Sequence, residues 1–285
     1  MDERSNVTVI IPCYNDGDFI EQALDSILNQ TLKAEKVIII DDGSDRKTRK
    51  ILEGIHINDV EIIFQENKGV SNARNTGIKL SKTDYILNLD ADDYFEPTFI
   101  EKAVRVLNSN STIGVVGSLV KVLKKNSIES EIIKPLGGKV KDFIVKNNGL
   151  GNSMFRKKCW EEVSGYDENM INGFEDWEFW IAVLRNNWSM YILQEPLSIY
   201  RIKKQSRDKT ALRDFDFELR KYIFLKHESL FLEHYKFYVL ELLRINCGLR
   251  KKQSVLKNSL NYKFGKSLLF PFRFLLKMFK KLWKN

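Results

Sequence analysis

The chain has 285 residues, of which 43% are hydrophobic and 29% are charged, and this composition excludes a disordered or fibrous protein. Its net charge of +8 is unevenly distributed. Residues 201–285 carry 22 Lys and Arg against 7 Asp and Glu, a net of +15, which leaves residues 1–200 at −7. An acidic body with a basic C-terminal part predicts a negatively charged partner for that part alone.

The first 110 residues alternate between strand and helix patterns. Short, β-branched, uniformly apolar runs predict buried strands, and helical patterns follow them, as in 19–29 with its apolar face. The predicted strands are 7–12, 36–41, 60–65 and 85–89. The predicted helices are 19–29, 47–52 and 96–108, and a further helix follows a loop within 67–81 and ends at about residue 80. This order predicts βαβ units on a parallel α/β sheet.

Two of the predicted strands end in acidic residues, "DDGS" at 41–44 and "DADD" at 90–93. Right-handed crossovers bring such strand ends to one edge of a parallel sheet, so both groups are expected to face one crevice. Carboxylates there suit Mg²⁺ or Mn²⁺, which often bind one or two protein carboxylates together with substrate phosphates. The alternative is an Asp-rich, solvated turn.

The pattern becomes mixed after residue 109. Strands are predicted at about 113–123, 151–156, 190–193 and 197–202, with helices at 157–165 and 174–187 and helical sequence from residue 211 onward. The polar stretch 203–210 is the best candidate for a boundary. We therefore predict an α/β domain over 1–205 and a helical extension over 206–285.

Four ordered motifs give the chain a specific resemblance. "VTVIIPCYNDGDFIEQALDSILNQT", "IIIDDGSD", "NKGVSNARNTGI" and "YILNLDADD" match, in order, the N-terminal half of family 2 glycosyltransferases. These are nucleotide-sugar-dependent enzymes with the GT-A fold, and the resemblance covers about residues 6–205. It implies that the chain is a hexosyltransferase-type enzyme that uses a nucleotide-sugar donor.

The resemblance also implies a nucleotide pocket. The backbone from Pro12 to Tyr14 is expected to line the base, Asp42 to contact the base or ribose, and Arg74 to lie beside the pocket. Each residue has a simpler alternative. Asp42 could belong to a turn with a helix cap, Arg74 could lie on a helix surface, and Tyr14 could be core packing.

In the same way, the resemblance places Asp90 near the ribose and makes Asp92 the ligand of Mn²⁺ or Mg²⁺ on the diphosphate. A later motif, "YRIKKQS" at 200–206, departs from the family because a His often found there is replaced by Lys203. Lys203 and Arg207 are weaker candidates for holding the diphosphate. A solvated basic loop is the alternative.

A second acidic group lies in "GFEDWEFWIAV" at 173–183. Acidic residues at a helix start can simply complement the helix dipole. The bulky neighbours are expected to desolvate a carboxylate here and to raise its pKa towards the range of a general base. The resemblance implies that "ED" supplies the base, so we assign Asp176 as base and Glu175 as its support or as an acceptor contact. Trp177, which could equally be core, and Asn152 are weaker acceptor-side candidates.

The C-terminal residues 251–285 contain ten basic residues and no acidic one. On a helical wheel, the basic residues of 266–285 share a narrow face opposite Leu, Phe and Trp, a pattern typical of helices that lie on a membrane. The alternative is a helix packed on the catalytic domain. The expected location is therefore cytoplasmic and peripheral on the inner face of the cell membrane, with no nucleic acid partner.

The expected reaction is inverting transfer of a sugar, with UDP favoured only by family habit, to a saccharide or lipid-linked saccharide in the synthesis of a surface polysaccharide such as O-antigen or capsule. Two other functions stay open. One is a sugar-phosphate nucleotidyltransferase, although its glycine-rich phosphate loop is not evident after the first strand. The other is a non-catalytic membrane scaffold on a transferase fold.

Overall fold

The computed structural model describes residues 5–124, 127–203 and 207–271. The chain divides into two compact units, 1–233 and 234–285, and each is described by itself.

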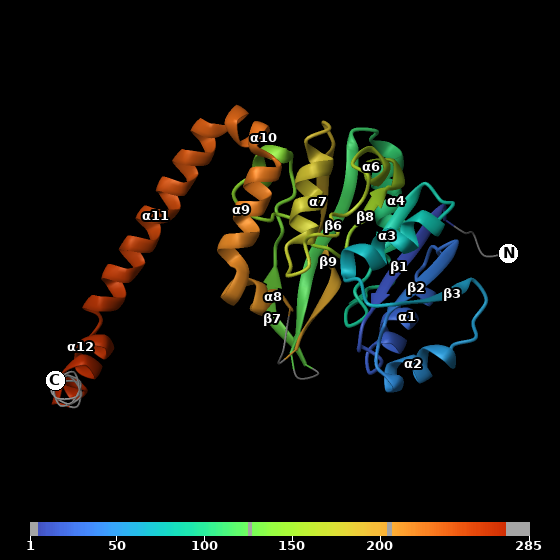
Figure 1. Ribbon diagram of the computed structural model, residues 1–285, viewed down its shortest axis with the longest axis horizontal. Helices are drawn as coiled ribbons and strands as arrows, with labels where there is room; N and C mark the ends of the chain where they lie inside the picture. The colour runs from blue at the N-terminus through green and yellow to red at the C-terminus, as the bar shows by residue number, and fades with distance from the viewer. Residues whose placement is uncertain (1–4, 125–126, 204–206, 272–285) are drawn as a thin grey trace. The chain divides into compact units, whose positions relative to one another are not determined.

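The first unit is built on a nine-stranded mixed sheet (Figure 1). Its parallel part contains β1 (Val7–Cys13), β2 (Lys36–Asp42), β3 (Val60–Gln65) and β4 (Tyr85–Asn88). Its mixed part contains β5 (Tyr94–Phe95), β6 (Ile113–Lys124), β7 (Ser127–Ile133), β8 (Met154–Arg156) and β9 (Ser189–Ile202). The order is β3-β2-β1-β4-β8-β6-β9-β5, with β7 beside β6. The structure confirms the predicted α/β class, with a parallel half followed by a mixed half.

Helices cover both faces of the sheet because successive strand residues point to opposite sides. Val9 and Ile11 of β1 share a core with buried residues of α1 (Ile20–Leu28), α2 (Arg46–Glu53) and α4 (Phe99–Ser109). Ile10 faces the other side, towards Gly77 of α3 (Val70–Leu80). A Cβ atom on Gly77 would lie 2.7 Å from Ile10 Cγ2, so the glycine permits this close approach.

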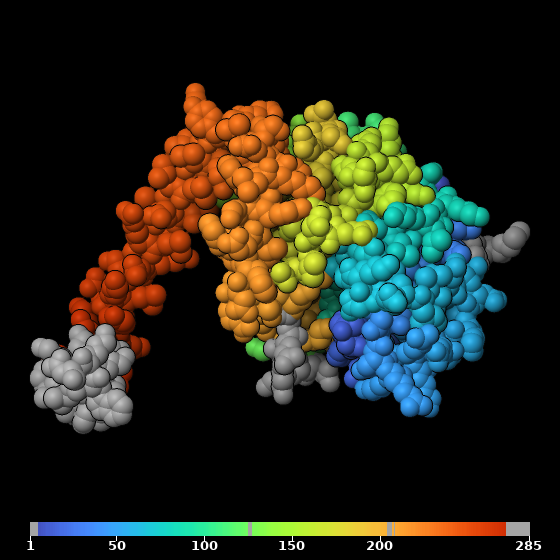
Figure 2. Space-filling view, viewed as in Figure 1, coloured from blue at the N-terminus to red at the C-terminus, as the bar shows by residue number. Residues whose placement is uncertain are grey.

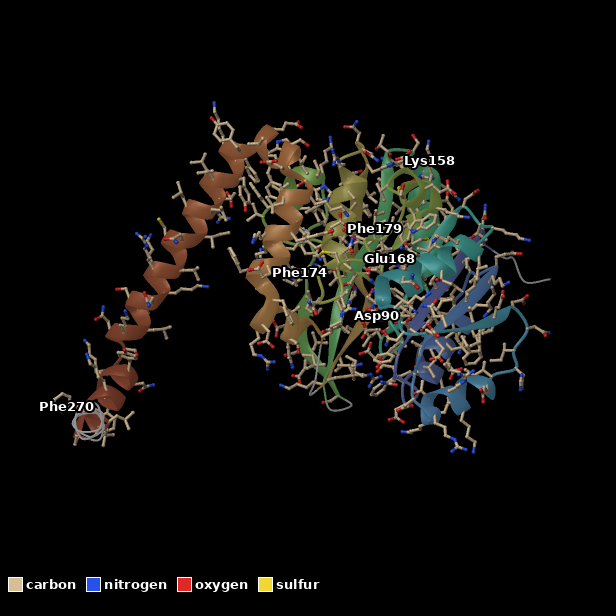
Figure 3. All side chains as sticks on the ribbon, viewed as in Figure 1. Asp90, Lys158, Glu168, Phe174, Phe179 and Phe270 are labelled. Carbon is tan, nitrogen blue, oxygen red and sulfur yellow. The ribbon has the colours of Figure 1, made fainter. Side chains whose placement is uncertain are left out.

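Helix α7 (Glu175–Leu184) packs on the mixed half of the sheet through aromatic contacts. The ring of Phe155 on β8 lies 5.5 Å from that of Phe179 and 5.9 Å from that of Trp180. Phe179, labelled in Figure 3, lies within the body of the unit and is fully buried. The short helices α5 (Val140–Phe143) and α6 (Lys157–Glu162) complete this half.

The two short strands predicted at 190–193 and 197–202 form one continuous strand, β9. Its pairing with β6 shifts register where Ser118 pairs with Leu193 and Leu119 with Pro196. Extra residues on β9 at that point form an irregularity of the β-bulge kind, which interrupts the pairing but not the strand. The sequence pattern showed the interruption, and the structure shows that it lies inside one strand.

The first unit extends to Glu233, past the boundary predicted at residue 205. Four helical segments continue it: α8 (Arg207–Thr210), the π-helical turn η1 (Ala211–Phe215), α9 (Asp216–Lys226) and α10 (Glu228–Glu233). Leu219 and Ile223 are buried, and His227 contacts Glu178 of α7 at 2.8 Å. In Figure 2 these orange helices lie against the yellow-green atoms of the preceding segment. Buried apolar side chains therefore attach 207–233 to the rest of the first unit.

The second unit contains α11 (Tyr235–Asn258) and α12 (Leu260–Leu268), and neither helix contains a buried residue. Exposed apolar side chains occur along both helices and beyond, including Leu242, Leu249, Phe264 and Phe270, the last labelled in Figure 3. The amphipathic helix predicted for 266–285 lies mainly in 272–285, outside the described residues. Within the described ranges, no helix combines the length and apolar character needed to cross a bilayer.

Candidate functional site

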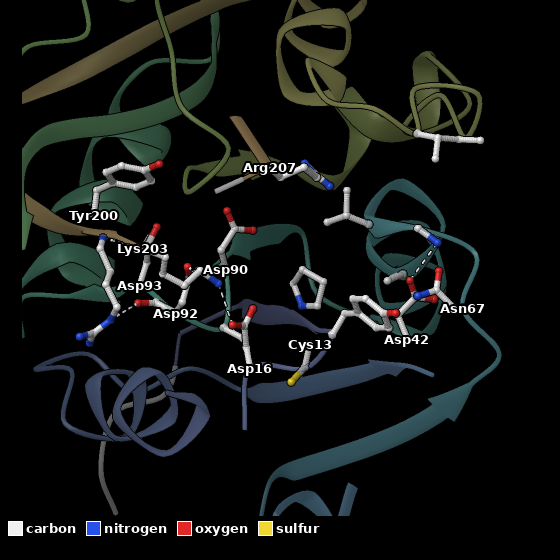
Figure 4. A pocket seen from close by; sticks show the side chains of 18 residues that line it. Cys13, Asp16, Asp42, Asn67, Asp90, Asp92, Asp93, Tyr200, Lys203 and Arg207 are labelled. Atoms are coloured by element: carbon white, nitrogen blue, oxygen red, sulfur yellow. Dashed lines mark hydrogen bonds and ion pairs between the residues drawn. The ribbon is translucent and has the colours of Figure 1, made fainter. Parts of the chain in front are cut away.

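A cleft of about 400 Å³ lies at the carboxyl ends of β1, β2 and β4 and beside the end of β9 (Figure 4). Because these strand ends meet at one edge, residues far apart in the sequence share its wall. Seven of the predicted site residues line it: Pro12, Tyr14, Asp42, Asp90, Asp92, Lys203 and Arg207. A smaller cavity of about 90 Å³ is lined by Arg74, Asn152, Glu175 and Asp176, and it shares Asp90 and Arg207 with the cleft.

Tyr14 and Asp42, the two side chains predicted to contact the nucleotide, both line this cleft. Tyr14 is 51% exposed, so the alternative that it is core packing is wrong. Asp42 is buried and accepts hydrogen bonds from the backbone N–H groups of Lys68 (2.9 Å) and Gly69 (2.8 Å). It therefore fixes the loop that leads into α3. The helix cap in this motif is Asp45, which accepts from Thr48 N at the start of α2.

The acidic turn after β4 is held in place by hydrogen bonds. Asn152 accepts from Asp90 N (2.8 Å) and donates to Asp93 Oδ2 (2.6 Å), while Arg201 N donates to Asp93 Oδ1 (2.8 Å). Burial, together with the nearby charges of Asp92 and Asp90, raises the pKa of Asp93 well above its usual range. The predicted acceptor-side residue Asn152 thus braces the turn from the smaller cavity.

Lys203 from the end of β9 forms two ion pairs inside the cleft. Its Nζ lies 2.8 Å from Asp92 Oδ2 and 2.7 Å from Asp16 Oδ1. Burial raises the pKa of Asp92, and the Lys203 ammonium opposes that rise. The alternative of a solvated basic loop is therefore wrong for Lys203.

The acidic turn has a donor set that fits an open Mg²⁺ or Mn²⁺ site. Arg74 contacts Oδ1 of Asp90 and Lys203 contacts Oδ2 of Asp92, so each ion pair engages one of two carboxylate oxygens. The described residues include no group of three or more His, Cys, Asp and Glu side chains arranged to hold a metal. A divalent ion on Asp92 would therefore complete its shell with water and substrate oxygens, as Mg²⁺ commonly does.

Glu175, in the first turn of α7, forms ion pairs with two arginines. Its Oε1 accepts from Arg74 Nη1 at 2.9 Å and also from Arg207 Nη2. Burial would raise the pKa of Glu175, but the guanidinium groups of Arg207 and Arg74 outweigh this effect and lower it to about 2. Glu175, predicted as the support of the base, therefore does not have the raised pKa expected of the base itself. The alternative of a surface position is wrong for Arg74, which is 1% exposed.

Asp176 follows Glu175 but has a different environment. It is half-buried, lines the smaller cavity, and accepts a hydrogen bond from Asn147 Nδ2 at 2.9 Å. A carboxylate at a cavity wall can receive a proton from a ligand, whereas Glu175 is held between two guanidinium groups. Asp176, predicted as the base, therefore lies where a ligand in the smaller cavity could reach it.

Trp177 lies in the interior of the unit. Its side chain is 4% exposed in the fold and its Nε1 donates to the carbonyl of Phe143 at 2.7 Å. It is not among the described residues that line the two cavities. The structure therefore places Trp177 in the packing of α7 against α5, which agrees with the alternative that it belongs to the core.

Sequence reasoning missed several residues that shape the site: Asp16, Asp93, Asn147, Tyr200 and Arg201. Two of them carried a signal. Asp16 follows the first strand closely, as Asp42 and Asp90 follow theirs, and Arg201 stands two residues before Lys203. Asn147 lies in a loop without such a pattern.

Comparison with known proteins gives consistent matches. The family model described as "Glycosyl transferase family 2" matches residues 8–163. An uncharacterized glycosyltransferase of Methanocaldococcus jannaschii is 29% identical over 70% of this chain and 72% of its own length. Poly-beta-1,6-N-acetyl-D-glucosamine synthase of Staphylococcus aureus is 28% identical over 71% of this chain, but the match spans 48% of that enzyme. Chondroitin synthase of Escherichia coli is 29% identical over 59% of this chain and 25% of its own length.

Among solved structures, S. aureus TarS has the same fold. The crystal structure of its residues 1–349 in complex with UDP-GlcNAc superposes with a TM-score of 0.60 and 18% identity, covering 72% of this chain and 61% of that one. The complex with UDP gives a TM-score of 0.57 over 69% of this chain and 60% of that one.

Proposed function

Because the chain belongs to glycosyl transferase family 2, we propose that it transfers a sugar from a nucleoside diphosphate sugar to a hydroxyl group of a saccharide or lipid-linked saccharide. One observation carries the proposal. The acidic turn at Asp90–Asp92 lines a cleft large enough for a nucleotide, and the adjoining cavity contains the carboxylate of Asp176. We infer a UDP-sugar as donor because TarS, which has the same fold, was crystallised with UDP and with UDP-GlcNAc.

In this proposal the nucleotide lies over Pro12, Tyr14 and Asp42, and its diphosphate lies at the acidic turn. Mg²⁺ or Mn²⁺, when bound, supplies positive charge for the negative charge that develops on the leaving diphosphate. Asp92 is the residue that would hold this ion. Lys203 and Arg207, which line the same cleft, would contact diphosphate oxygens.

The transfer step uses the smaller cavity. Asp176 accepts the proton of the acceptor hydroxyl as its oxygen forms a bond to the anomeric carbon. The bond between that carbon and the diphosphate oxygen breaks, and the electron pair leaves with the nucleoside diphosphate. Attack from the face opposite the leaving group inverts the anomeric centre, through a transition state with oxocarbenium character as in glycoside hydrolysis.

Thermal-shift binding tests the donor half of the proposal. UDP, GDP, CMP and dTDP would each be added with and without Mn²⁺ to wild type, Asp92→Ala and the control Asp25→Ala, which changes an exposed residue of α1. A ligand in large excess over its Kd stabilises the folded protein by a few kcal/mol. We expect a Mn²⁺-dependent shift for UDP in wild type and in Asp25→Ala that is lost in Asp92→Ala.

A shift with a nucleotide other than UDP would mean that the donor sugar is carried by that nucleotide instead. A shift without any dependence on Mn²⁺ would contradict the metal-dependent form of the mechanism. If no nucleotide stabilises the protein, the scaffold function would take the place of the enzyme. Release of pyrophosphate from a nucleoside triphosphate would instead favour a nucleotidyltransferase.

We further propose that the second unit brings the enzyme to an anionic membrane surface, where a lipid-linked acceptor would be found. Residues 234–271 contain eight Lys and Arg and one acidic residue, Glu241. Neither α11 nor α12 contains a buried residue, and apolar side chains are exposed along both. Exposed apolar groups next to Lys and Arg suit the boundary between headgroups and acyl chains. This would place the enzyme on the cytoplasmic face of the membrane, where nucleotide sugars are available.

A further inference from the structure

Lys203 joins two acidic segments of the cleft. Asp92 belongs to the turn after β4 and Asp16 to the loop after β1, and the Lys203 ammonium contacts both at 2.8 and 2.7 Å. The side chains of Lys203, Asp92 and Asp16 are 30%, 16% and 21% exposed. The close-up in Figure 4 shows the three side chains meeting at one side of the cleft. Lys203 is thus the counter-ion of the carboxylate proposed to hold the metal.

The chain around Lys203 is fixed by other contacts. Arg201, two residues earlier, donates from its backbone N–H to Asp93 and from Nε to the carbonyl of Asp92, at 2.8 Å each. The ring of Phe19 lies below both cations, 4.7 Å from the Arg201 guanidinium carbon and 5.7 Å from Lys203 Nζ. These contacts fix the backbone at the end of β9, so Lys203 is held next to the acidic turn. Its flexible side chain allows the ammonium to move while the backbone stays in place.

An ammonium and a divalent cation compete for the same carboxylate. A divalent ion on Asp92 would lie within a few ångströms of the Lys203 charge, and like charges repel at that distance. When the Lys203 ammonium moves away from Asp92, it still has Asp16 as an ion-pair partner. A nucleoside diphosphate entering the cleft would offer its oxygens as a further partner.

We propose that Lys203 shields Asp92 from a divalent ion in the free enzyme and moves to the diphosphate when the donor binds. The inference rests on the proposed function, because it gives Lys203 a part in donor binding. It makes metal and diphosphate binding co-operative: the diphosphate draws the ammonium away from Asp92, and the exposed carboxylate then accepts the ion. Such coupling is reciprocal, so the ion strengthens diphosphate binding by the same factor.

Binding measurements on the full chain test this inference without any assay of activity. Free Mn²⁺ would be titrated by electron paramagnetic resonance, and UDP binding in EDTA would be measured by calorimetry, for wild type and Lys203→Met. The matched control is Lys121→Met, which removes the ion pair between Lys121 and Glu96 outside both cavities. This pair has the same length as that between Lys203 and Asp16, 2.7 Å, and its side chains are 33% and 36% exposed. Lys203→Arg keeps the charge, and a thermal melt verifies that each variant is folded.

We expect Lys203→Met to bind Mn²⁺ alone at least tenfold more tightly than wild type, and to bind UDP in EDTA at least tenfold more weakly. Lys121→Met should match wild type in both measurements, and Lys203→Arg should retain weak Mn²⁺ binding. If Lys203 had only a structural role, its replacement would weaken the binding of both Mn²⁺ and UDP. Tighter binding of Mn²⁺ together with weaker binding of UDP therefore identifies the shielding role.

Mn²⁺ binding to Lys203→Met that is unchanged, weaker or unmeasurable would overturn the inference. The Mn²⁺ titration contains no nucleotide, so its failure concerns Lys203 alone. Absence of UDP, GDP, CMP and dTDP binding to wild type would instead contradict the proposed function. The two failures are therefore distinguishable.

Discussion

Arg74 and Glu175 form a buried ion pair, with 2.9 Å between Nη1 and Oε1 and side chains that are 2% and 4% exposed. Arg74 belongs to α3 and Glu175 to α7, on the same side of the sheet. The other end of the Arg74 guanidinium contacts Asp90 at 2.7 Å. One side chain therefore links the acidic turn of the larger cleft to the helix that begins at the smaller cavity.

Glu175→Gln should destabilise the protein strongly at neutral pH. The substitution leaves the guanidinium groups of Arg74 and Arg207 without their shared carboxylate, and removing one partner of a buried ion pair costs about 3–5 kcal/mol. Chemical denaturation at pH 7 measures the loss. The control Glu161→Gln changes an exposed residue of α6 and should alter stability by less than about 0.5 kcal/mol. Equal stability of the two variants would contradict the assigned role.

The same pair should make stability depend on pH in the acid range. The pKa of Glu175 is lowered from 4.5 to about 2 in the folded protein, so the folded state takes up the proton later than the unfolded state. Its stabilising contribution is complete above about pH 4.5 and is lost as pH falls towards 2. The difference in Tm between wild type and Glu175→Gln should therefore shrink between pH 5 and pH 3. A difference that stays constant over this range would show that the charge of Glu175 is not what stabilises the fold.

Asp176→Asn should remove the general base and leave the donor site intact. We expect kcat to fall by roughly 10² to 10⁴, the range typical of a lost acid–base catalyst. UDP binding should stay within a factor of two, because Asp176 lines the smaller cavity and not the nucleotide cleft. Release of UDP from the donor in the presence of acceptor gives kcat, and calorimetry gives the affinity. Asp25→Asn serves as the exposed control, and unchanged kcat in Asp176→Asn would remove Asp176 from the mechanism.

The variant Trp177→Phe tests whether the Trp177 side chain serves core packing or acceptor binding. The replacement keeps an aromatic ring but removes the hydrogen bond from Nε1 to the carbonyl of Phe143, which should cost about 1–3 kcal/mol because that carbonyl loses its partner in the interior. The KM for acceptor should not change, since the side chain lies in the interior. A higher KM with unchanged stability would return Trp177 to the acceptor side.

Replacing Arg250, Lys251 and Lys252 of α11 by Gln should weaken binding to anionic vesicles. Each basic residue near an anionic surface contributes about 1 kcal/mol, so three replacements should lower the affinity by about 100-fold. Co-sedimentation of the full chain with phosphatidylglycerol vesicles measures the change, and neutral vesicles provide the reference.

The control for this experiment replaces Lys47, Lys50 and Lys158 of the first unit in the same way. These three residues are exposed, and their replacement removes the same net charge. The control variant should bind vesicles as wild type does. Equal binding by the α11 variant and wild type would contradict a role for α11 at the membrane.

The sequence by itself determined the features that depend on local chemistry. Runs of β-branched residues and helical periodicity predicted the alternating elements up to residue 109, and the polar residues at the strand ends predicted one shared crevice. The order of motifs predicted the family, which the match over residues 8–163 confirms. These signals are local, because a pattern within some ten residues is enough to specify a strand, a helix or a turn.

Only the tertiary structure decided which charges meet. Lys203 reaches Asp16, 187 residues earlier, and Glu175 reaches Arg74 across 101 residues. No local pattern encodes such partners, because they depend on how strand ends and helices pack against one another. The same packing separates Asp176 from Trp177: they are neighbours in the sequence, yet α7 turns one towards a cavity and buries the other against α5. Burial and ion pairing, which set the pKa and hence the role of each group, follow from that packing.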